Sequence, residues 1–291
     1  MTPVPTNDPH AEALTDQQLQ SFVEFACELA DAAATITLPS FRQPSGVENK
    51  LDDNGFDPVT NADRAAEQAM RELIAKRYPS HAILGEDYGH SSDGNKLTNK
   101  LTWILDPIDG TRAFISGLPT WGTLIALFDG SKPVLGVMDQ PFTAERYIAS
   151  SGTGQTTGIV HGIESQLHTR DCQYLAQATM MSTAPDMFTT VEFDTQQNLA
   201  SEVRLMRYGG DCYAYCMLAG GHVDLVVEAG LSTYDIQALI PIVENAGGVL
   251  TDWQGDSAVN GGQVVAAATR KLHQQALVRL QPAAKKSATI L

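Results

Sequence analysis

The segment Trp103-Ile104-Leu105-Asp106-Pro107-Ile108-Asp109-Gly110-Thr111 places two aspartates, three residues apart, directly after an apolar run. The apolar residues of 101–105 predict a strand that carries the first aspartate at its end. Pro107 is expected to stop a simple continuation of this strand, because proline has no N–H for the ladder. The chain then turns, and Thr111 begins a predicted helix. Two carboxylates on such a turn can face one metal pocket, and two solvated aspartates on an ordinary turn are the alternative.

Three more acidic residues lie at the ends of predicted elements. Glu86 follows the apolar run 82–84, Asp63 lies in the first turn of a predicted helix, and Asp235 begins another. Taken singly, each is also explained as a solvated turn residue or as a carboxylate that complements a helix dipole. Together with the aspartates of 106–109 they indicate a site for a hard cation, since Mg²⁺ prefers oxygen ligands. Two such ions could activate a water and stabilise the leaving oxygen of a phosphoryl group.

The rest of the sequence alternates between helical and strand patterns. Thr15 opens a capping box and predicts a helix, and a second helix is expected to start near Asn61. After residue 80, short apolar runs indicate strands, and Pro241 is expected to kink one of the later helices. Because helices alternate with strands in both halves, layered sheets and helices are expected. The later helices are predicted near 211–220, 234–246 and 270–280.

Composition shifts along the chain predict two domains between flexible ends. The first residues contain several prolines and no periodicity, and the stretch Gly152–Gly158, rich in Gly and Thr, is interpreted as a linker. The predicted division is a flexible N-terminal tail at 1–14, an α+β domain at 15–152, an α/β domain at 153–282 and a tail at 283–291.

Charge and composition exclude several classes of protein. The chain has 291 residues, with 19 Lys and Arg against 34 Asp and Glu, a formal charge of −15 and a pI near 4.7. Such acidity argues against a dedicated nucleic-acid binder, which needs basic surface for phosphates. Four cysteines make no disulfide framework in a chain of this length. The sequence lacks the pattern of a leader and any apolar run of about 18 residues, so a cytoplasmic protein is expected, without nucleic-acid or membrane partners.

Four motifs, in matching order across about residues 16–280, resemble those of the inositol monophosphatase superfamily. Two departures from its pattern, Asp87 for a glutamate and Tyr234 for a tryptophan, affect neighbours of the expected ligands and not the ligands themselves. The matching segments are Pro58–Asp63 for the first motif, Leu84–Asp87 for the G-E-E motif, Asp106–Thr111 for the signature, and Tyr234–Ala238 with Glu244–Gly248 for the second signature.

The resemblance implies a fold and a chemistry. The fold would be a layered αβαβα sandwich of the inositol monophosphatase and fructose-1,6-bisphosphatase type, on the border of the α+β and α/β classes. Members of this superfamily are Mg²⁺-dependent, typically lithium-sensitive phosphatases, and they are often homodimers.

The resemblance also implies a metal site with two to three Mg²⁺ ions. Glu86, Asp106 and the carbonyl of Ile108 would hold the first ion, and Glu86 would also serve a weaker third one. Asp106, Asp109 and Asp235 would hold the second, with Asp106 as the bridging ligand. The first domain would thus supply most metal ligands, and the second domain would supply Asp235 and the residues that select the substrate.

Further roles carry over to the reaction itself. Asp63 and Thr111 would orient and deprotonate the attacking water, and the backbone amides of Gly110 and Thr111 would bind the phosphate, since amides at a helix N-terminus suit an anion. Lys50 lies in a position that resembles the family's loop lysine, near the metal and phosphate.

The substrate region resembles the histidinol-phosphate phosphatase branch, in the stretches 109–117 and 207–215. Asp211 and Glu228 could pair with the ammonium and imidazole of histidinol phosphate through charge-assisted hydrogen bonds. The alternatives are that Asp211 caps the helix that follows it and that Glu228 is a solvated strand-end carboxylate. Arg207 is a further candidate, as a partner for a carboxylate across an interface.

The main hypothesis is therefore a Mg²⁺-dependent phosphomonoesterase that converts L-histidinol phosphate to L-histidinol and phosphate in histidine biosynthesis. A metal-activated water would attack phosphorus directly and in line, because the residues offer metals and a water base but no activated nucleophile. The alternatives are an inositol-1-monophosphatase, or a phosphatase of another sugar or polyol phosphate, and a non-catalytic scaffold. Cys212 and Cys216, four residues apart, are interpreted as the buried face of a helix.

Overall fold

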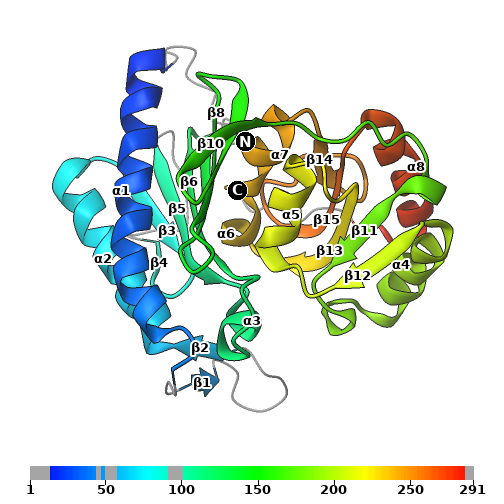
Figure 1. The fold of residues 1–291 in the computed structure, drawn as a ribbon, viewed down its shortest axis with the longest axis horizontal. Coiled ribbons are helices and arrows are strands. Elements are labelled where there is room, and N and C mark those ends of the chain that lie inside the picture. Colours follow the sequence, from blue (N-terminus) through cyan, green and yellow to red (C-terminus); the bar gives the residue numbers. More distant parts are fainter. Residues whose placement is uncertain (1–13, 44–46, 50–57, 91–100, 286–291) are drawn as a thin grey trace, which may run out of the picture.

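The computed structural model describes residues 14–43, 47–49, 58–90 and 101–285. It is a sandwich of five layers, helix–sheet–helix–sheet–helix, as Figure 1 shows from the blue helices on one side to the red helix on the other. Two helices cover the outer face of the first sheet, three lie between the sheets, and two cover the outer face of the second. The layered sandwich expected from the sequence is confirmed. Lys50 and most of the two predicted tails lie outside the described residues.

The first layer is a pair of helices whose N-termini the sequence defines. Helix α1 (Asp16–Ser40) begins after Thr15 and α2 (Asn61–Arg77) begins after Thr60, and both have capping boxes in which side chain and backbone bond reciprocally. Their apolar stripes bury Phe25, Met70 and other side chains against Trp103 of the first sheet. Burial of this stripe removes apolar surface from water and holds the helices on the sheet.

The first sheet has eight strands in the order β10-β9-β8-β7-β6-β5-β3-β4. Only β3 and β5 pair in parallel among the described strands of this sheet, and the other neighbouring strands pair antiparallel. The strands are β3 (Ala82–Gly85), β4 (Gly89–His90), β5 (Thr102–Asp109), β6 (Gly122–Phe128), β7 (Pro133–Gln140), β8 (Glu145–Ser150), β9 (Gln155–Val160) and β10 (Ile163–Leu167). A separate pair, β1 (Val47–Asn49) and β2 (Pro58–Thr60), precedes α2.

The second sheet has five strands in the order β12-β11-β13-β15-β14. Its strands are β11 (Thr179–Ser182), β12 (Leu205–Tyr208), β13 (Leu225–Leu231), β14 (Val249–Asp252) and β15 (Gly262–Ala267). Between the sheets lie α5 (Asp211–Ala219), α6 (Thr233–Ile236) and α7 (Leu239–Asn245), while α4 (Thr190–Glu202) and α8 (Arg270–Leu280) cover the outer face and α3 (Thr111–Ile115) follows β5. Short 3₁₀ turns occur at Leu175–Gln177, Pro185–Met187 and Gln281–Ala283.

Two local predictions need correction. Pro107 does interrupt the regular ladder, as expected, because a bulge lies between Asp106 and Asp109, but the strand extends beyond Leu105 as β5 to Asp109. The predicted helix 234–246 is two helices, and the break lies at Gln237–Ala238 and not at Pro241, which falls in the first turn of α7, where its missing N–H has no helical partner to lose.

The predicted linker contains structure of its own. Residues 155–158 of the stretch Gly152–Gly158 belong to β9, which pairs with β8 and extends the first sheet. The chain passes from the first sheet to the second after Leu167. A division into domains at residue 152 stays a prediction. No helix in the described part of the chain is both long and apolar enough to span a bilayer.

Candidate functional site

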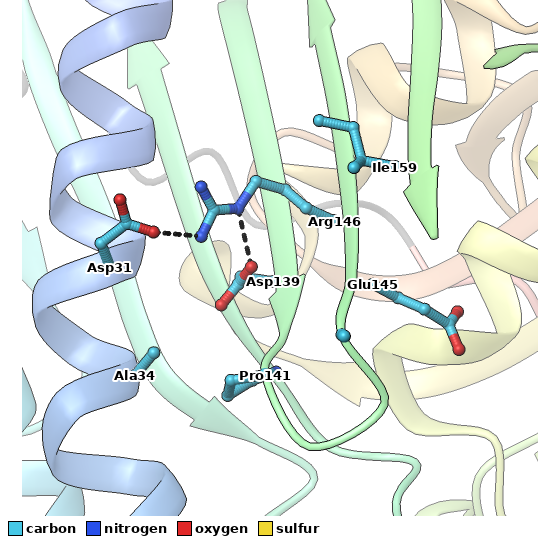
Figure 2. Close-up of a pocket in the computed structure, with 8 residues that line it drawn as sticks. Asp31, Ala34, Asp139, Pro141, Glu145, Arg146 and Ile159 are labelled. Atoms are coloured by element: carbon cyan, nitrogen blue, oxygen red, sulfur yellow. Dashed lines mark hydrogen bonds and ion pairs between the residues drawn. The ribbon is translucent and has the colours of Figure 1, made fainter. Parts of the chain in front are cut away.

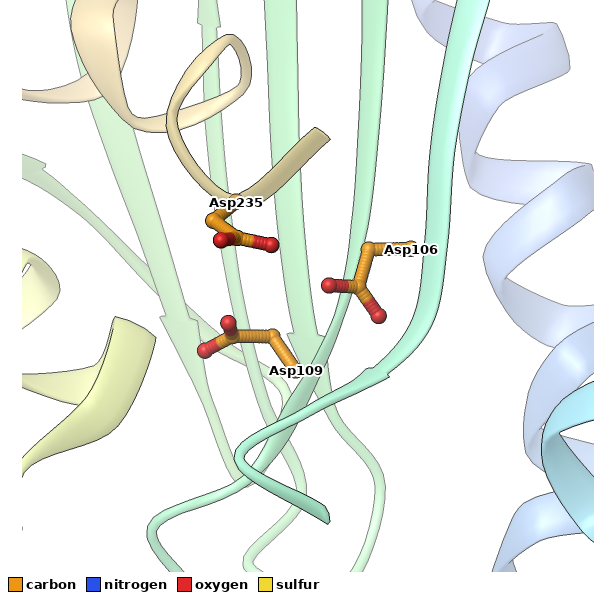
Figure 3. A group of neighbouring side chains, drawn as sticks. All are labelled: Asp106, Asp109 and Asp235. Atoms are coloured by element: carbon orange, nitrogen blue, oxygen red, sulfur yellow. The ribbon is translucent and has the colours of Figure 1, made fainter. Parts of the chain in front are cut away.

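Three aspartates from distant parts of the chain converge between the two sheets. One carboxylate oxygen each of Asp106, Asp109 and Asp235 lies within 4.8 Å of the others, and Figure 3 shows the three side chains pointing toward one another from β5 and α6. In a regular strand, residues three apart face opposite sides. The bulge in β5 removes this conflict, and the Thr123 hydroxyl fixes it by donating to the Pro107 carbonyl at 2.8 Å.

Backbone amides orient each of these carboxylates. Asp106 Oδ1 accepts from the Ile108 N–H at 3.1 Å, and Asp235 Oδ2 accepts from the Ser232 N–H at 2.7 Å in the capping box of α6. Asp109 Oδ2 accepts from the N–H of Cys212 at 2.8 Å and so caps α5. These bonds use one oxygen of each carboxylate and hold the rest of the group in a fixed direction.

The electrostatics of the cluster disfavour three bare negative charges. Burial raises the pKa of Asp106 and of Asp109 well above the usual range, and neighbouring carboxylates raise both further. Burial likewise raises the pKa of Asp235 to about 7. Among the described residues, no lysine or arginine forms an ion pair with any of the three. A cation from outside the chain would stabilise the ionised cluster.

Glu86 and Ile108, the other predicted metal ligands, lie beside this cluster. Glu86 follows β3, is half-buried, and its charge raises the pKa of Asp106 and Asp235. Its backbone N–H donates to the Leu105 carbonyl at 3.2 Å, which ties it to β5. The Ile108 carbonyl accepts from the Thr111 hydroxyl at 3.0 Å. The ligand roles of Glu86 and Ile108 stay predictions.

Asp63 is buried at the start of α2. Its Oδ2 accepts from the Thr60 N–H at 2.9 Å and from the Thr60 hydroxyl at 2.6 Å, which is the capping role that the sequence left as an alternative. Burial raises the pKa of Asp63 to about 7, and the charge of Glu86 adds to this shift. Such a pKa suits a general base near neutral pH.

Gly110 and Thr111 form the turn that follows the cluster. Gly110 has φ +82°, the left-handed conformation that glycine adopts without strain, and is the N-cap of α3. A Cβ at this position would lie 3.0 Å from Cβ of Asp211. The turn is therefore packed against the second half of the chain, and phosphate binding by its amides stays a prediction.

A cavity of about 70 Å³ beside the cluster contains both predicted substrate residues. Glu228 is buried on β13, where its two oxygens accept from the hydroxyls of Thr183 at 2.5 Å and Tyr215 at 2.8 Å. Burial raises the pKa of Glu228 to about 7 despite these donors. The lining residues are Asp109, Thr183, Met187, Asp211, Cys212, Tyr215, Glu228, Leu231, Asp235 and Leu239. Glu228 is thus no solvated strand-end carboxylate, and that alternative was wrong.

Asp211 is the first residue of α5 and adopts φ +44°. Its side chain caps nothing, since Gly210 is the N-cap and Asp109 accepts the N–H of Cys212, so the capping alternative was wrong. The Thr120 hydroxyl donates to Asp211 at 3.5 Å, and burial raises the pKa of Asp211 to about 6. The strained backbone aims a carboxylate into the cavity.

Two predicted residues receive no support as site residues. Lys50 lies outside the described residues. Arg207 is an exposed residue of β12, at the edge of the second sheet, and its role stays a prediction.

Sequence reasoning missed Thr183 and Tyr215, which hold the side chain of Glu228. It included Thr60, which holds the side chain of Asp63, as part of a capping motif. Thr60 had a local signal, since Thr-x-x-Asp is the spacing of a capping box. Thr183 is 45 residues from its partner, and no sequence pattern connects the two.

A second and larger cavity, of about 280 Å³, lies between α1 and the strands β7, β8 and β9. Figure 2 shows Arg146 between two aspartates: its Nη2 donates to Asp31 at 2.6 Å and its Nε to Asp139 at 2.7 Å. The guanidinium pairs with both carboxylates and ties α1 to the sheet. This cluster carries its own cation and serves packing.

The cysteines are free thiols, and burial of Cys212 and Cys216 in α5 confirms their interpretation as core residues. Burial raises the pKa of both thiols well above the usual value. They are therefore held as neutral groups within the middle layer.

Comparison with known proteins identifies the family. Residues 18–286 match the inositol monophosphatase family. The chain is 41% identical over 277 residues to the bifunctional phosphatase IMPL2, chloroplastic, of Arabidopsis thaliana, covering 92% of this chain and 77% of that protein. It is 34% identical over 258 residues to a histidinol-phosphatase of Chlorobaculum parvum, covering 86% and 93%. A solved inositol monophosphatase from Zymomonas mobilis has a TM-score of 0.78 at 40% identity, covering 90% of this chain and 98% of its own. The chain belongs to the inositol monophosphatase family.

Family membership places the chain among metal-dependent phosphatases, which typically use Mg²⁺ and act on small phosphorylated substrates. The residues present fit such an ion. The cluster offers only hard oxygen donors, Asp106 is buried and Asp109 and Asp235 are half-buried, and no positive side chain of the described residues neutralises it.

Proposed function

We propose that this protein is a Mg²⁺-dependent phosphomonoesterase that hydrolyses L-histidinol phosphate to L-histidinol and phosphate. One observation carries the proposal: the cavity beside the aspartate cluster is lined by two further carboxylates, Asp211 and Glu228. A phosphate ester bound at the cluster would extend its alcohol part into an acidic cavity. Histidinol offers an ammonium and an imidazole there, whereas inositol offers neutral hydroxyls.

Asp106, Asp109 and Asp235 would hold Mg²⁺, with Glu86 and the Ile108 carbonyl as further ligands. When bound, Mg²⁺ supplies positive charge for the phosphoryl oxygens and lowers the pKa of a coordinated water. The number of ions, two to three, is part of the proposal.

Asp63 would accept the proton of the attacking water. Its Oδ2 is held by Thr60, so that the carboxylate keeps one orientation, and its pKa of about 7 matches the task. Thr111 would orient the water through its hydroxyl oxygen, since its proton is already donated to the Ile108 carbonyl. The amides of Gly110 and Thr111 would bind phosphate. Water would attack phosphorus directly, without a phosphoenzyme.

Charge complementarity would select the substrate. A histidinol ammonium at Glu228 would meet a buried carboxylate whose orientation two hydroxyl groups fix. Such a charge-assisted hydrogen bond contributes about 1.5–3 kcal/mol, or roughly 10- to 100-fold in kcat/KM. Relatives named histidinol-phosphatase, at 32–34% identity, support this reading.

The test compares initial rates on histidinol phosphate and on inositol 1-phosphate at saturating Mg²⁺, for the native chain and for Glu228→Gln. We expect a preference for histidinol phosphate that falls roughly 10-fold or more in the variant. An equal or reversed preference in the native chain would overturn the histidinol assignment and favour an inositol phosphatase. That second candidate is supported by the 40% identity to the Zymomonas mobilis inositol monophosphatase.

We also propose that the protein is a homodimer and is located in the cytoplasm. Light scattering on the purified protein would test the dimer, and a mass of one chain would exclude it. The Arabidopsis thaliana relative is named chloroplastic, so the compartment needs its own test, by fractionation of the source cells.

A further inference from the structure

Helix α2 carries a second buried carboxylate, Glu67, one turn after Asp63. Its side chain is fully buried, yet it lines no part of the cavity beside the cluster. Arg71, another turn on, donates from Nε to Glu67 Oε1 at 2.6 Å and has 12% of its side chain exposed. Asp63, Glu67 and Arg71 are spaced by four and so share one face of α2.

Glu67 and Arg71 together hold the chain on which Glu86 lies. Glu67 Oε2 accepts from the Asp87 N–H at 2.8 Å, and its Oε1 accepts from the Tyr88 N–H at 3.3 Å. Arg71 donates from Nη2 to the Gly89 carbonyl, and its guanidinium carbon lies 5.8 Å from the centre of the Tyr88 ring. The turn from β3 to β4 is therefore bound to α2 directly after Glu86.

The packing before Glu86 is equally specific. A Cβ at Gly85 would lie 2.0 Å from Glu67 Oε1, so the carboxylate occupies the place that any other residue's side chain would need. On the other side, the Glu86 N–H donates to β5 at the Leu105 carbonyl, next to Asp106. Glu86 is thus fixed between α2 and β5 by contacts to its neighbours on both sides.

We propose that Glu67 is a positioning residue that fixes Glu86 for metal binding and sets its place relative to Asp63. The inference rests on the proposed function, because it takes Glu86 as a ligand. It also gives the glycine before Glu86 a physical reason, since the buried carboxylate excludes a side chain there. A group of this kind contributes to metal affinity although it touches no metal.

Two substitutions test this clamp, by which we mean the contacts of Glu67 with Gly85, Asp87 and Tyr88. Glu67→Gln keeps the size of the side chain but removes its charge and one acceptor. Gly85→Ala keeps the carboxylate of Glu67 but adds a methyl group that forces it to shift. Glu72→Gln is the matched control, because it is the same substitution at an exposed position of the same helix. Melting temperatures identify any variant that fails to fold.

Mg²⁺ binding to the metal-free protein, measured by calorimetry, is the main readout. We expect Glu67→Gln and Gly85→Ala to weaken Mg²⁺ binding roughly 10- to 100-fold, and Glu72→Gln to leave it unchanged. At saturating Mg²⁺ the kcat of the two clamp variants should return close to the native value. Amide hydrogen exchange at Asp87 and Tyr88 should accelerate in Glu67→Gln without Mg²⁺ present.

A double variant separates positioning from general damage. In Glu67→Ala the space beside Gly85 is empty, so adding Gly85→Ala should weaken Mg²⁺ binding no further. Native Mg²⁺ affinity in folded Glu67→Gln, or additive effects in the double variant, would overturn the clamp and leave the proposed function standing. If Glu67→Gln weakens Mg²⁺ binding but the native protein releases phosphate from neither histidinol phosphate nor inositol 1-phosphate, the proposed function is overturned and the clamp stands.

Discussion

Two groups of aspartates in this molecule differ in whether a basic side chain of the described residues pairs with them. Asp31 and Asp139 share Arg146 between them, at 2.6 and 2.7 Å. One carboxylate oxygen each of Asp106, Asp109 and Asp235 lies within 4.8 Å of the others, and within the described ranges no basic side chain forms an ion pair with them. The first group has its cation on the chain itself. The second has no basic partner among the described residues.

The difference has a physical consequence for folding. Burial of like charges without a partner is unfavourable, and a chain tolerates it only where something outside the chain repays it. The paired group stabilises the junction of α1 with the sheet at all times. The unpaired group is expected to weaken the metal-free protein and to strengthen it once a cation binds.

Replacing a ligand of the unpaired group should have the largest effect. Asp106→Asn is expected to lower phosphate release at least about 10³-fold, because a bound metal supplies several kcal/mol of transition-state stabilisation. The metal-free variant should be as stable as the native chain or more stable, since one buried like charge is removed. Initial rates and urea unfolding measure the two quantities. Near-native activity would show that the cluster is not the site.

An Asp→Asn substitution in the paired group should instead lower stability and leave activity unchanged. Asp139→Asn leaves Arg146 with only its exposed partner, and breaking a buried pair of this kind is expected to cost about 3 kcal/mol of unfolding free energy. Activity at a temperature where the variant is folded should stay close to native. Lost activity in a stable variant would contradict the division between the groups.

The pH dependence of the metal-free protein sharpens the contrast. Asp63, Asp235 and Glu228 have folded-state pKa values of about 7, above their unfolded values, so the folded chain holds more protons and loses stability as pH rises through 7. Burial lowers the pKa of His273 to about 4, which acts in the opposite direction, but only between about pH 4 and 6.5.

Between pH 6.5 and 8, unfolding free energy without metal should therefore fall by on the order of 1–2 kcal/mol. Saturating Mg²⁺ at pH 8 should restore it. Urea titrations with and without EDTA measure both. If the unfolding free energy in EDTA rises over this interval, the pKa values of these carboxyl groups are not raised as described.

The smallest effect is expected at the exposed member of the paired group. The side chain of Asp31 is 70% exposed, so Asp31→Asn should cost less than about 1 kcal/mol and change no rate. A thermal melt measures this loss. A cost as large as that of Asp139→Asn would mean that Arg146 depends on both carboxylates equally.

Local signals in the sequence predicted much of this structure. The capping boxes at Thr15 and Thr60 define the starts of α1 and α2, and the runs of apolar residues define most of the strands. The cluster of Asp106, Asp109 and Asp235 was also expected, from the resemblance of its motifs and their position at the ends of elements. The capping boxes and the apolar runs depend on neighbours within a few residues, which a sequence shows directly, whereas Asp235 is distant in sequence from the other two aspartates of the cluster.

Features that depend on distant contacts could not be predicted. The strand continues past Pro107 because β6 accommodates a bulge, and Asp109 accepts the N–H of Cys212, 103 residues away, at the start of α5. Glu228 is buried because Thr183 and Tyr215 satisfy both its oxygens. No periodicity or spacing encodes such pairings, since they arise only when the two sheets close on the middle helices.

We expect the unpaired aspartates to form a Mg²⁺ site. Calorimetric titration of Mg²⁺ into the metal-free native chain, Asp106→Asn and Asp139→Asn at pH 8 tests this. We predict binding in the native chain and in Asp139→Asn, and its loss in Asp106→Asn. Binding in none of the three, or equal binding in all, would contradict it.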